Sequence, residues 1–217
     1  MKLYSFFRSS AAYRVRIALN LKGLPYEVIP IHLVRSGGEQ LTPEYRELNP
    51  MALVPAFIDD ANSRAVLTQS LAIIEYLEEE YPAPPLLPAD AGDRAYVRSI
   101  ALSIACDIHP LNNLRVLRYL VRKLNVSEDD KNAWYRHWVE EGLGSIEALL
   151  AKDPRAGTFC LGDSPTMADC CLVPQIANAQ RFNCELSHVP TIMRIHDACI
   201  ALDAFANAAP ANQPDAE

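Results

Sequence analysis

Two adjacent serines near the start of the chain lie where an anion could be held. A strand pattern at residues 3–5 gives way to apolar residues at helical spacing, which Gly23 ends. Ser9 and Ser10 therefore stand at a helix N-terminus, where free backbone N–H groups and the positive dipole end favour an anion. Arg8 adds a fixed positive charge. Taken alone, an ordinary serine N-cap also explains this pair.

Two further motifs could complete such a site. Ser70 begins another predicted helix after Gln69, so hydroxyl and amide donors stand at a second helix N-terminus, although this pair alone is a capping sequence. Pro55 enters a strand, which places it at an edge or in a tight turn, sometimes with a cis bond. A cis bond would leave the N–H and C=O of Val54 free to pair with an extended peptide. An ordinary loop-to-strand proline is the alternative.

The elements that carry these motifs alternate between strand and helix. Their order is βαβαββα, which predicts a small mixed sheet covered by helices. The proline-rich residues 83–87 read as a stiff linker, and the residues after them have helical spacing without a convincing strand. We therefore predict a first domain at residues 1–82 and an all-helical domain at 88–217, which ends in a loose tail.

Composition narrows the class of protein. Of the 217 residues, 50% are hydrophobic and 22% are charged, and no apolar run reaches the roughly 20 residues of a membrane span. The net charge of -7 argues against a nucleic-acid partner. Six cysteines without metal-ligand spacing indicate free thiols and no metal site. We expect a cytoplasmic protein whose N-terminal site has no thiol of its own, since no cysteine precedes Cys106.

One motif of the helical part predicts stability and not chemistry. Thr166 precedes a helical pattern and Asp169 follows three residues later. That spacing is typical of a capping box, worth about 1 kcal/mol to a helix.

Together, these motifs resemble the zeta-class glutathione transferases. The matching segments are Arg8-Ser9-Ser10, Val54-Pro55 and the run that starts at Gln69-Ser70, and they continue through residues 108–113, 166–169 and 172–182. The class includes isomerases of maleylacetoacetate and of maleylpyruvate. The resemblance covers nearly the whole chain, and it implies a thioredoxin-like N-terminal domain that binds glutathione, an all-helical transferase domain and a homodimer.

The resemblance also implies roles for single residues. Ser9 and Ser10 would contact the glutathione sulfur, Val54 would pair with the cysteinyl backbone, and Gln69 and Ser70 would hold the γ-glutamyl end. Gln40 and His109 would reach the glycyl or γ-glutamyl groups. The basic positions that line the acceptor site correspond to Arg8, Arg115 and Arg181. Three guanidinium groups would suit a substrate with two carboxylates.

The reaction implied is a glutathione-dependent cis–trans isomerisation. The thiolate, favoured by Ser9 or Ser10 and by Arg8, would add to the cis double bond of a maleyl keto acid, and rotation and elimination would give the fumaryl isomer. Maleylacetoacetate and maleylpyruvate both remain open as substrates, and a general glutathione transferase is a further alternative. The class signature usually has Ser-Ser-Cys, but Ala11 stands here, which favours maleylpyruvate slightly.

Overall fold

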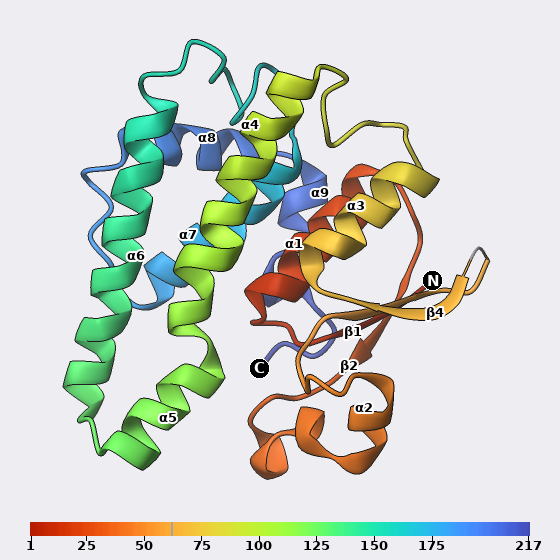
Figure 1. The fold of residues 1–217 in the computed structure, drawn as a ribbon, viewed down its shortest axis with the longest axis vertical. Coiled ribbons are helices and arrows are strands. Elements are labelled where there is room, and N and C mark those ends of the chain that lie inside the picture. The colour runs from red at the N-terminus through yellow and green to blue at the C-terminus, as the bar shows by residue number, and fades with distance from the viewer. Residues whose placement is uncertain (62) are drawn as a thin grey trace. The chain divides into compact units, whose positions relative to one another are not determined.

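The computed structural model describes residues 1–61 and 63–217 (Figure 1). The chain forms two compact units. The first consists of residues Met1–Leu86 together with Ala201–Glu217, and the second of Leu87–Ile200. None of the helices in the described ranges is both long enough and apolar enough to cross a membrane.

A four-stranded mixed sheet forms the centre of the N-terminal unit. Its order is β2-β1-β3-β4, with β1 (Lys2–Ser5) parallel to β2 (Glu27–Pro30). The antiparallel strands are β3 (Ala56–Asp59) and β4 (Ser63–Thr68). Strand β1 ends at Ser5, and three residues separate it from the predicted serine pair, so the sheet places that pair beyond its carboxyl edge.

Helices complete this unit in the predicted βαβαββα order. The helices are α1 (Ser10–Leu21), α2 (Pro43–Leu48) and α3 (Ser70–Glu80), with two 3-10 turns, η1 (Arg35–Gly37) and η2 (Glu39–Leu41), before α2. Helices α1 and α3 pack together. Leu3, Ile17 and Phe57 are fully buried and form part of the core. The predicted thioredoxin-like topology is confirmed.

The second unit is helical throughout, also as predicted. Its elements are α4 (Ala91–Leu102), a π-helical turn η3 (Ser103–Ile108), a 3-10 turn η4 (His109–Asn112), α5 (Leu114–Leu124), α6 (Glu128–Leu150), α7 (Met167–Arg181) and α8 (Pro190–Ile200). Helix α7 packs against α4 and α8. It begins with the predicted capping box, in which the Asp169 carboxylate accepts hydrogen bonds from the backbone N–H and hydroxyl of Thr166.

The last seventeen residues differ from the sequence interpretation. The sequence predicts that they belong to the helical domain, with a loose tail at residues 208–214, whereas the structure groups residues 201–217 with the N-terminal unit. Helix α9 (Asp203–Ala206) packs against α1, and a final 3-10 turn η5 (Pro210–Asn212) follows. Phe205 and Ala208 are fully buried, and the Asp215 carboxylate accepts a hydrogen bond from the backbone N–H of Phe7 at 2.9 Å. Long-range contacts, which an Ala- and Pro-rich sequence does not reveal, order this segment.

Candidate functional site

Ser9 caps the helix that follows strand β1. Its Oγ accepts a hydrogen bond from the backbone N–H of Ala12 at 3.2 Å, and its own N–H donates to the carbonyl of Phe6 at 2.9 Å. Ser9 is half-buried, while Ser10, the first helical residue, is buried. Because an accepting hydroxyl keeps its hydrogen, Ser9 can still donate to a bound group.

A buried arginine fixes the loop between β1 and α1. Arg16 is fully buried, and its guanidinium donates to the carbonyl of Phe7 at 3.0 Å and to Ser5 Oγ at 3.0 Å. A third bond, from Nε to the carbonyl of Ala208 at 3.0 Å, ties the C-terminal segment to the same side chain. By contrast, Arg8 is exposed, with its guanidinium 4.9 Å from the centre of the Phe7 ring. The two arginines therefore differ in whether their donors are already used.

Val54 presents an open backbone edge beside this loop. The peptide bond to Pro55 is cis, the isomer on which the sequence hypothesis depended. The preceding carbonyl, that of Leu53, accepts hydrogen bonds from the Tyr45 hydroxyl and the Asn49 amide, both at 2.8 Å. The Val54 side chain packs with the two phenylalanines of the β1–α1 loop. Within the described part of the chain, the Val54 N–H and C=O have no hydrogen-bond partner.

The start of α3 has an unusual backbone. Gln69 has a φ of 70°, a left-handed conformation that costs a non-glycine residue about 1–3 kcal/mol and is concentrated at functional sites. Its carbonyl accepts the N–H of Ile73 at 3.0 Å, while its side chain is exposed and makes no capping bond. Ser70 is buried, and its Oγ accepts a hydrogen bond from the guanidinium of Arg14 at 3.3 Å. Since Arg14 belongs to α1, it links the two helix N-termini.

Gln40 is buried in the segment before α2. Its Nε2 donates to the carbonyl of Leu33 at 3.4 Å, and its Oε1 is buried without a partner among the described residues. Gly38, with a φ of 118°, makes room for it, because a Cβ there would lie 2.7 Å from the Gln40 amide. The side chain is thus held in place with one acceptor unused.

In the helical unit, the turn that carries His109 is tied to α6. His109 opens turn η4 and is half-buried. The Asn112 amide donates to the carbonyl of Tyr135 at 3.3 Å, and the Trp134 indole N–H donates to the carbonyl of Leu111 at 3.0 Å. These two bonds fix where α5 begins.

Arg115 and Arg181 lie at helix ends in this unit, and both are exposed. Arg115 is in the first turn of α5, where its backbone N–H is capped by Asn113. Arg181 ends α7, with its guanidinium 4.9 Å from the centre of the Phe182 ring. That ring stacks on Tyr135, whose pKa burial raises to about 12 against the opposing charge of Arg181.

The predicted residues thus fall into two groups. Arg8, Ser9 and Ser10 share one loop and helix start, the apolar cluster of that loop joins them to Val54, and Arg14 joins α1 to Ser70. Gln69 and Gln40 belong to the same unit. The helical unit holds His109, Arg115 and Arg181.

The sequence analysis did not identify the residues whose hydrogen bonds hold the site loops in place. Arg14 and Arg16 flank Val15 in a helix whose middle is apolar, and this pattern could have indicated buried guanidinium groups. Tyr45 and Asn49 had no local signal, since their bonds to the Leu53 carbonyl depend on the loop conformation.

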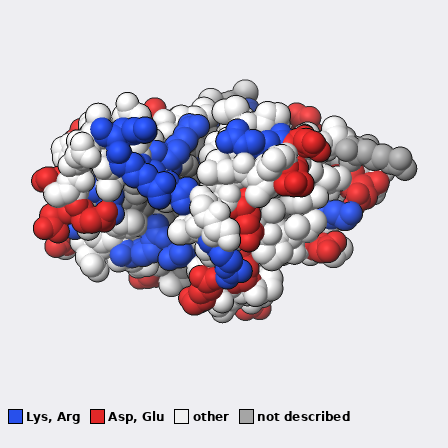
Figure 2. Space-filling view, turned by 90° about the horizontal axis from the view of Figure 1, so that it is seen from below, with Lys and Arg blue, Asp and Glu red and all other residues white. Residues whose placement is uncertain are grey.

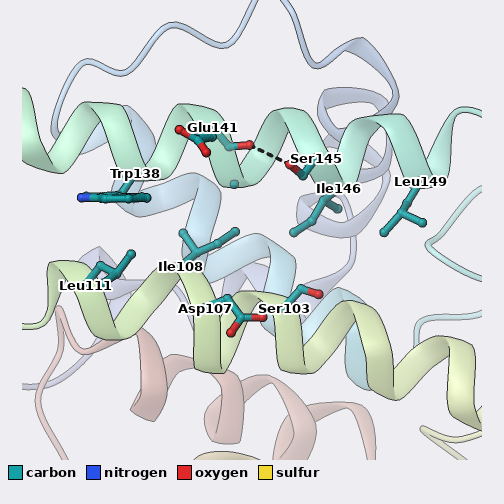
Figure 3. A pocket seen from close by; sticks show the side chains of 10 residues that line it. Ser103, Asp107, Ile108, Leu111, Trp138, Glu141, Ser145, Ile146 and Leu149 are labelled. Carbon is teal, nitrogen blue, oxygen red and sulfur yellow. Dashed lines mark hydrogen bonds between the residues drawn. The ribbon is translucent and has the colours of Figure 1, made fainter.

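The helical unit also has a groove that is lined by none of the predicted site residues (Figure 3). Its volume is about 250 Å³, and side chains from η3, η4 and α6 line it, including Ile108, Trp138 and Leu149. Gly142 allows the close approach of η3 to α6, because a Cβ there would lie 2.4 Å from the Ile108 side chain. The groove is mainly apolar, unlike the basic site predicted for the acceptor.

Comparisons with known proteins identify the family of this chain. The family models for the glutathione S-transferase N-terminal and C-terminal domains match residues 3–85 and 133–194. A probable maleylacetoacetate isomerase of Vibrio cholerae is 52% identical over 214 residues, which cover 99% of this chain and 97% of that protein. The chain therefore belongs to the glutathione S-transferase family. Its similarity to a zeta-class structure, described next, places it in the zeta class.

Two solved structures share the fold over the full length of both chains. The holo structure of a maleylpyruvate isomerase, described as a bacterial zeta-class glutathione S-transferase, has 51% identity and a TM-score of 0.95. A maleylacetoacetate isomerase from Methylobacterium extorquens, solved with bound malonate and glutathione, has 40% identity and a TM-score of 0.95.

Proposed function

We propose that this protein is a glutathione-dependent cis–trans isomerase that converts a maleyl keto acid to its fumaryl isomer. The observation that carries the proposal is the half-buried Ser9 hydroxyl at the N-terminus of α1, beside the open backbone of Val54. Relatives similar over almost the whole chain are isomerases of maleylacetoacetate and maleylpyruvate.

The N-terminal unit fits glutathione as its cofactor. Val54, whose backbone groups have no partner in the described residues, would pair with an extended peptide of that kind. The helix N-terminus at Gln69 and Ser70 would hold the γ-glutamyl carboxylate, since free N–H groups and the helix dipole favour an anion. Gln40, with its unused Oε1, would accept a hydrogen bond from the tripeptide backbone, and His109 would contact its glycyl or γ-glutamyl end.

The chemistry that bound glutathione supplies is a thiol that adds reversibly to the cis double bond. Ser9 Oγ keeps its hydrogen while it accepts from Ala12, so it would donate to the sulfur and stabilise the thiolate. Ser10 is the competing donor, but its burial favours Ser9. Arg8 would lower the thiol pKa further through its charge.

Arg115 and Arg181 would bind the carboxylates of the substrate, together with Arg8. All three are exposed. A guanidinium pairs with a carboxylate through two parallel hydrogen bonds, which fixes the orientation of the acid as well as its charge. An anionic substrate suits this set better than the apolar electrophiles of a general transferase.

Turnover of Ser9→Ala and Ser9→Gly, assayed with glutathione and each maleyl keto acid, tests the proposal. We expect both variants to lose about 100-fold in kcat, in the range of a lost charge-stabilising donor. Glycine keeps helix capping within a few tenths of a kcal/mol, so its loss of activity would not be a folding effect. Near-full activity in Ser9→Ala and Ser10→Ala would refute the thiolate role.

The same assay determines which of the two maleyl keto acids is the preferred substrate. Relatives of both names are about equally similar to this chain, so the two maleyl keto acids are compared directly by kcat/KM. Strong conjugation of an aryl halide with no isomerisation of either acid would instead support a general glutathione transferase.

We further propose a cytoplasmic homodimer. The free thiol state of all six cysteines supports a reducing compartment. Leu102 and Leu149, about half exposed, offer apolar surface for a second copy. Sedimentation analysis tests this, and we expect Leu149→Asp to shift the protein toward monomer. Ala148→Asp is the matched control, because it adds the same charge at the neighbouring exposed position of α6, and it should leave the dimer intact.

A further inference from the structure

Helix α5 carries four basic side chains and no acidic one. Arg115, Arg118 and Arg122 recur at intervals of three and four residues, which places them within an arc of about 60° on one helix face. Lys123 follows in the last turn. We call these four residues the basic ridge. Figure 2 shows Lys and Arg gathered over the end of the helical unit where α5 lies.

The ridge carries little compensating negative charge. In the part of the chain that the structure describes, Arg115, Arg122 and Lys123 are exposed and form no ion pair. Two of the three acids that follow α5 in sequence are engaged elsewhere: Glu128 pairs with Lys131, and the Asp130 carboxylate accepts from the Ser127 hydroxyl. Burial lowers the pKa of Arg118, and so does the charge of Arg122, because the two guanidinium groups repel each other.

Helix stability does not account for the whole ridge. Cations favour the C-terminal turn of a helix, which explains Arg122 and Lys123. Arg115 is in the first turn, where the dipole opposes a cation, and the spacing to Arg118 and Arg122 sets like charges side by side. A chain with a net charge of -7 thus places positive charge at Arg115 and Arg118, where helix stability does not favour it.

We infer that the basic ridge of α5 attracts the dianionic substrate from solution and delivers it toward Arg115. This inference rests on the proposed function, which places Arg115 in the acceptor site. Arg118 and Arg122 continue the Arg115 face along the helix, so the field extends outward from that residue. A patch of one sign raises the capture rate of an oppositely charged ligand and weakens as salt increases.

The test compares charge changes on and off the ridge. Arg122→Gln and Arg122→Glu remove one and two charges from an exposed position. Lys152→Gln and Lys152→Glu are matched controls, because Lys152 is exposed beyond the far end of α6, a helix roughly 34 Å long by its 23 residues. For each variant, kcat and kcat/KM for the maleyl keto acid are measured from about 10 to 300 mM ionic strength.

We expect kcat/KM at low salt to fall about twofold in Arg122→Gln and about fivefold in Arg122→Glu, with kcat unchanged. The difference from the parent protein should vanish at high salt, and the Lys152 variants should follow the parent. Equal losses in the Lys152 series, or no loss in Arg122→Glu, would overturn the inference. A loss that persists at high salt would also overturn it, since it would indicate direct contact.

A binding measurement separates this inference from the proposed reaction. Malonate, a dicarboxylate that does not react, is titrated calorimetrically into the glutathione-loaded parent and each variant. Weaker malonate binding in Arg122→Glu at low salt only supports the ridge even if neither maleyl acid is isomerised. Identical malonate affinity in the parent and Arg122→Glu overturns the ridge even if the isomerase activity is present.

Discussion

In both units, buried ionisable side chains hold loops by pairing with the backbone groups that turn inward. In the N-terminal unit, Arg16 donates to carbonyl oxygens of the β1–α1 loop, and Lys22 donates to the carbonyls of Tyr81 and Pro84. In the helical unit, the fully buried Asp169 accepts from the backbone N–H groups of Thr166 and Cys160. The charge of the side chain follows the groups that need partners: loops that turn carbonyls inward bind a cation, and a helix N-terminus binds an anion.

The comparison also separates structural arginines from the arginines that we propose to bind the substrate. Arg16 is buried with its donors used by the fold, whereas Arg115 and Arg181 are exposed at helix ends. Residue type alone therefore says little about role. The two kinds differ in burial: Arg16 is fully buried with its donors bound to the fold, whereas the guanidinium groups of Arg115 and Arg181 are exposed to solvent.

The largest expected effect is the loss of Arg16. Arg16→Met leaves several buried carbonyls without a donor, and we expect the free energy of unfolding to fall by roughly 3–5 kcal/mol. Urea denaturation followed by circular dichroism measures the change. Arg122→Met removes an exposed arginine and should cost under about 0.5 kcal/mol. Equal costs in the two variants would contradict the distinction between buried and exposed arginines.

Arg181→Gln should reduce activity and leave stability almost unchanged, which is the reverse of Arg16→Met. We expect kcat/KM to fall about 100-fold, or about 2.7 kcal/mol, because a carboxylate partner is lost, with under about 1 kcal/mol lost in stability. Arg194→Gln is the control, since Arg194 is also exposed but donates to the carbonyl of Gly157. An Arg181→Gln enzyme with normal kcat/KM would remove Arg181 from the site.

Asp169→Asn tests the buried carboxyl of the helical unit. An amide turns its NH2 group toward a donor of either Thr166 or Cys160, because the two carboxyl oxygens accept from different residues, and we expect a cost of about 2 kcal/mol at acidic pH. Burial raises the pKa of Asp169. Ionisation of Asp169 therefore opposes folding. The stabilisation that this side chain contributes is complete below the pKa of an unfolded Asp, about 3.9, and declines as pH rises through the raised pKa of the folded state. The gap between parent and variant in urea midpoints should narrow with rising pH; a widening gap would contradict this.

The smallest expected effect concerns the C-terminus. Glu217 pairs with Arg35 and His32, and the Arg35 guanidinium holds the pKa of its carboxyl below the usual value. The stabilisation from these ion pairs is therefore present above the pKa of an unfolded Glu, about 4.3, and is lost as pH falls through the lowered pKa of the folded state. Glu217→Gln should lower the thermal midpoint by about 1 °C or less at pH 7 and not at all at pH 3. Glu79→Gln is an exposed control.

Local signals in the sequence predicted most of the fold and the caps at two helix N-termini. The Ser9 cap, the capping box of Thr166 and Asp169, and the strand and helix order each depend on neighbouring residues, and each is present in the structure. The left-handed backbone of Gln69 could not be predicted, because a glutamine there gives no sign of it.

Contacts between distant parts of the chain set the rest. The hydrogen bond from Arg16 to the carbonyl of Ala208 spans 192 positions, and no periodicity in residues 201–217 predicts it. The π-helical turn at Ser103–Ile108 likewise reads as ordinary helix in the sequence, because its apolar residues keep helical spacing. Such features depend on packing, which a single sequence does not encode locally.

The return of the C-terminal segment to α1 determines the order in which the protein can be completed during synthesis. The ribosome makes the sheet and its helices first, but the residues that cover Arg16 and Tyr13 are made after the helical unit. The unit that carries Ser9 therefore reaches its final form only after residues 201–217 have been made. An affinity tag fused after Glu217 would begin beside His32 and Arg35, so a tag at the N-terminus is the better choice for kinetic work.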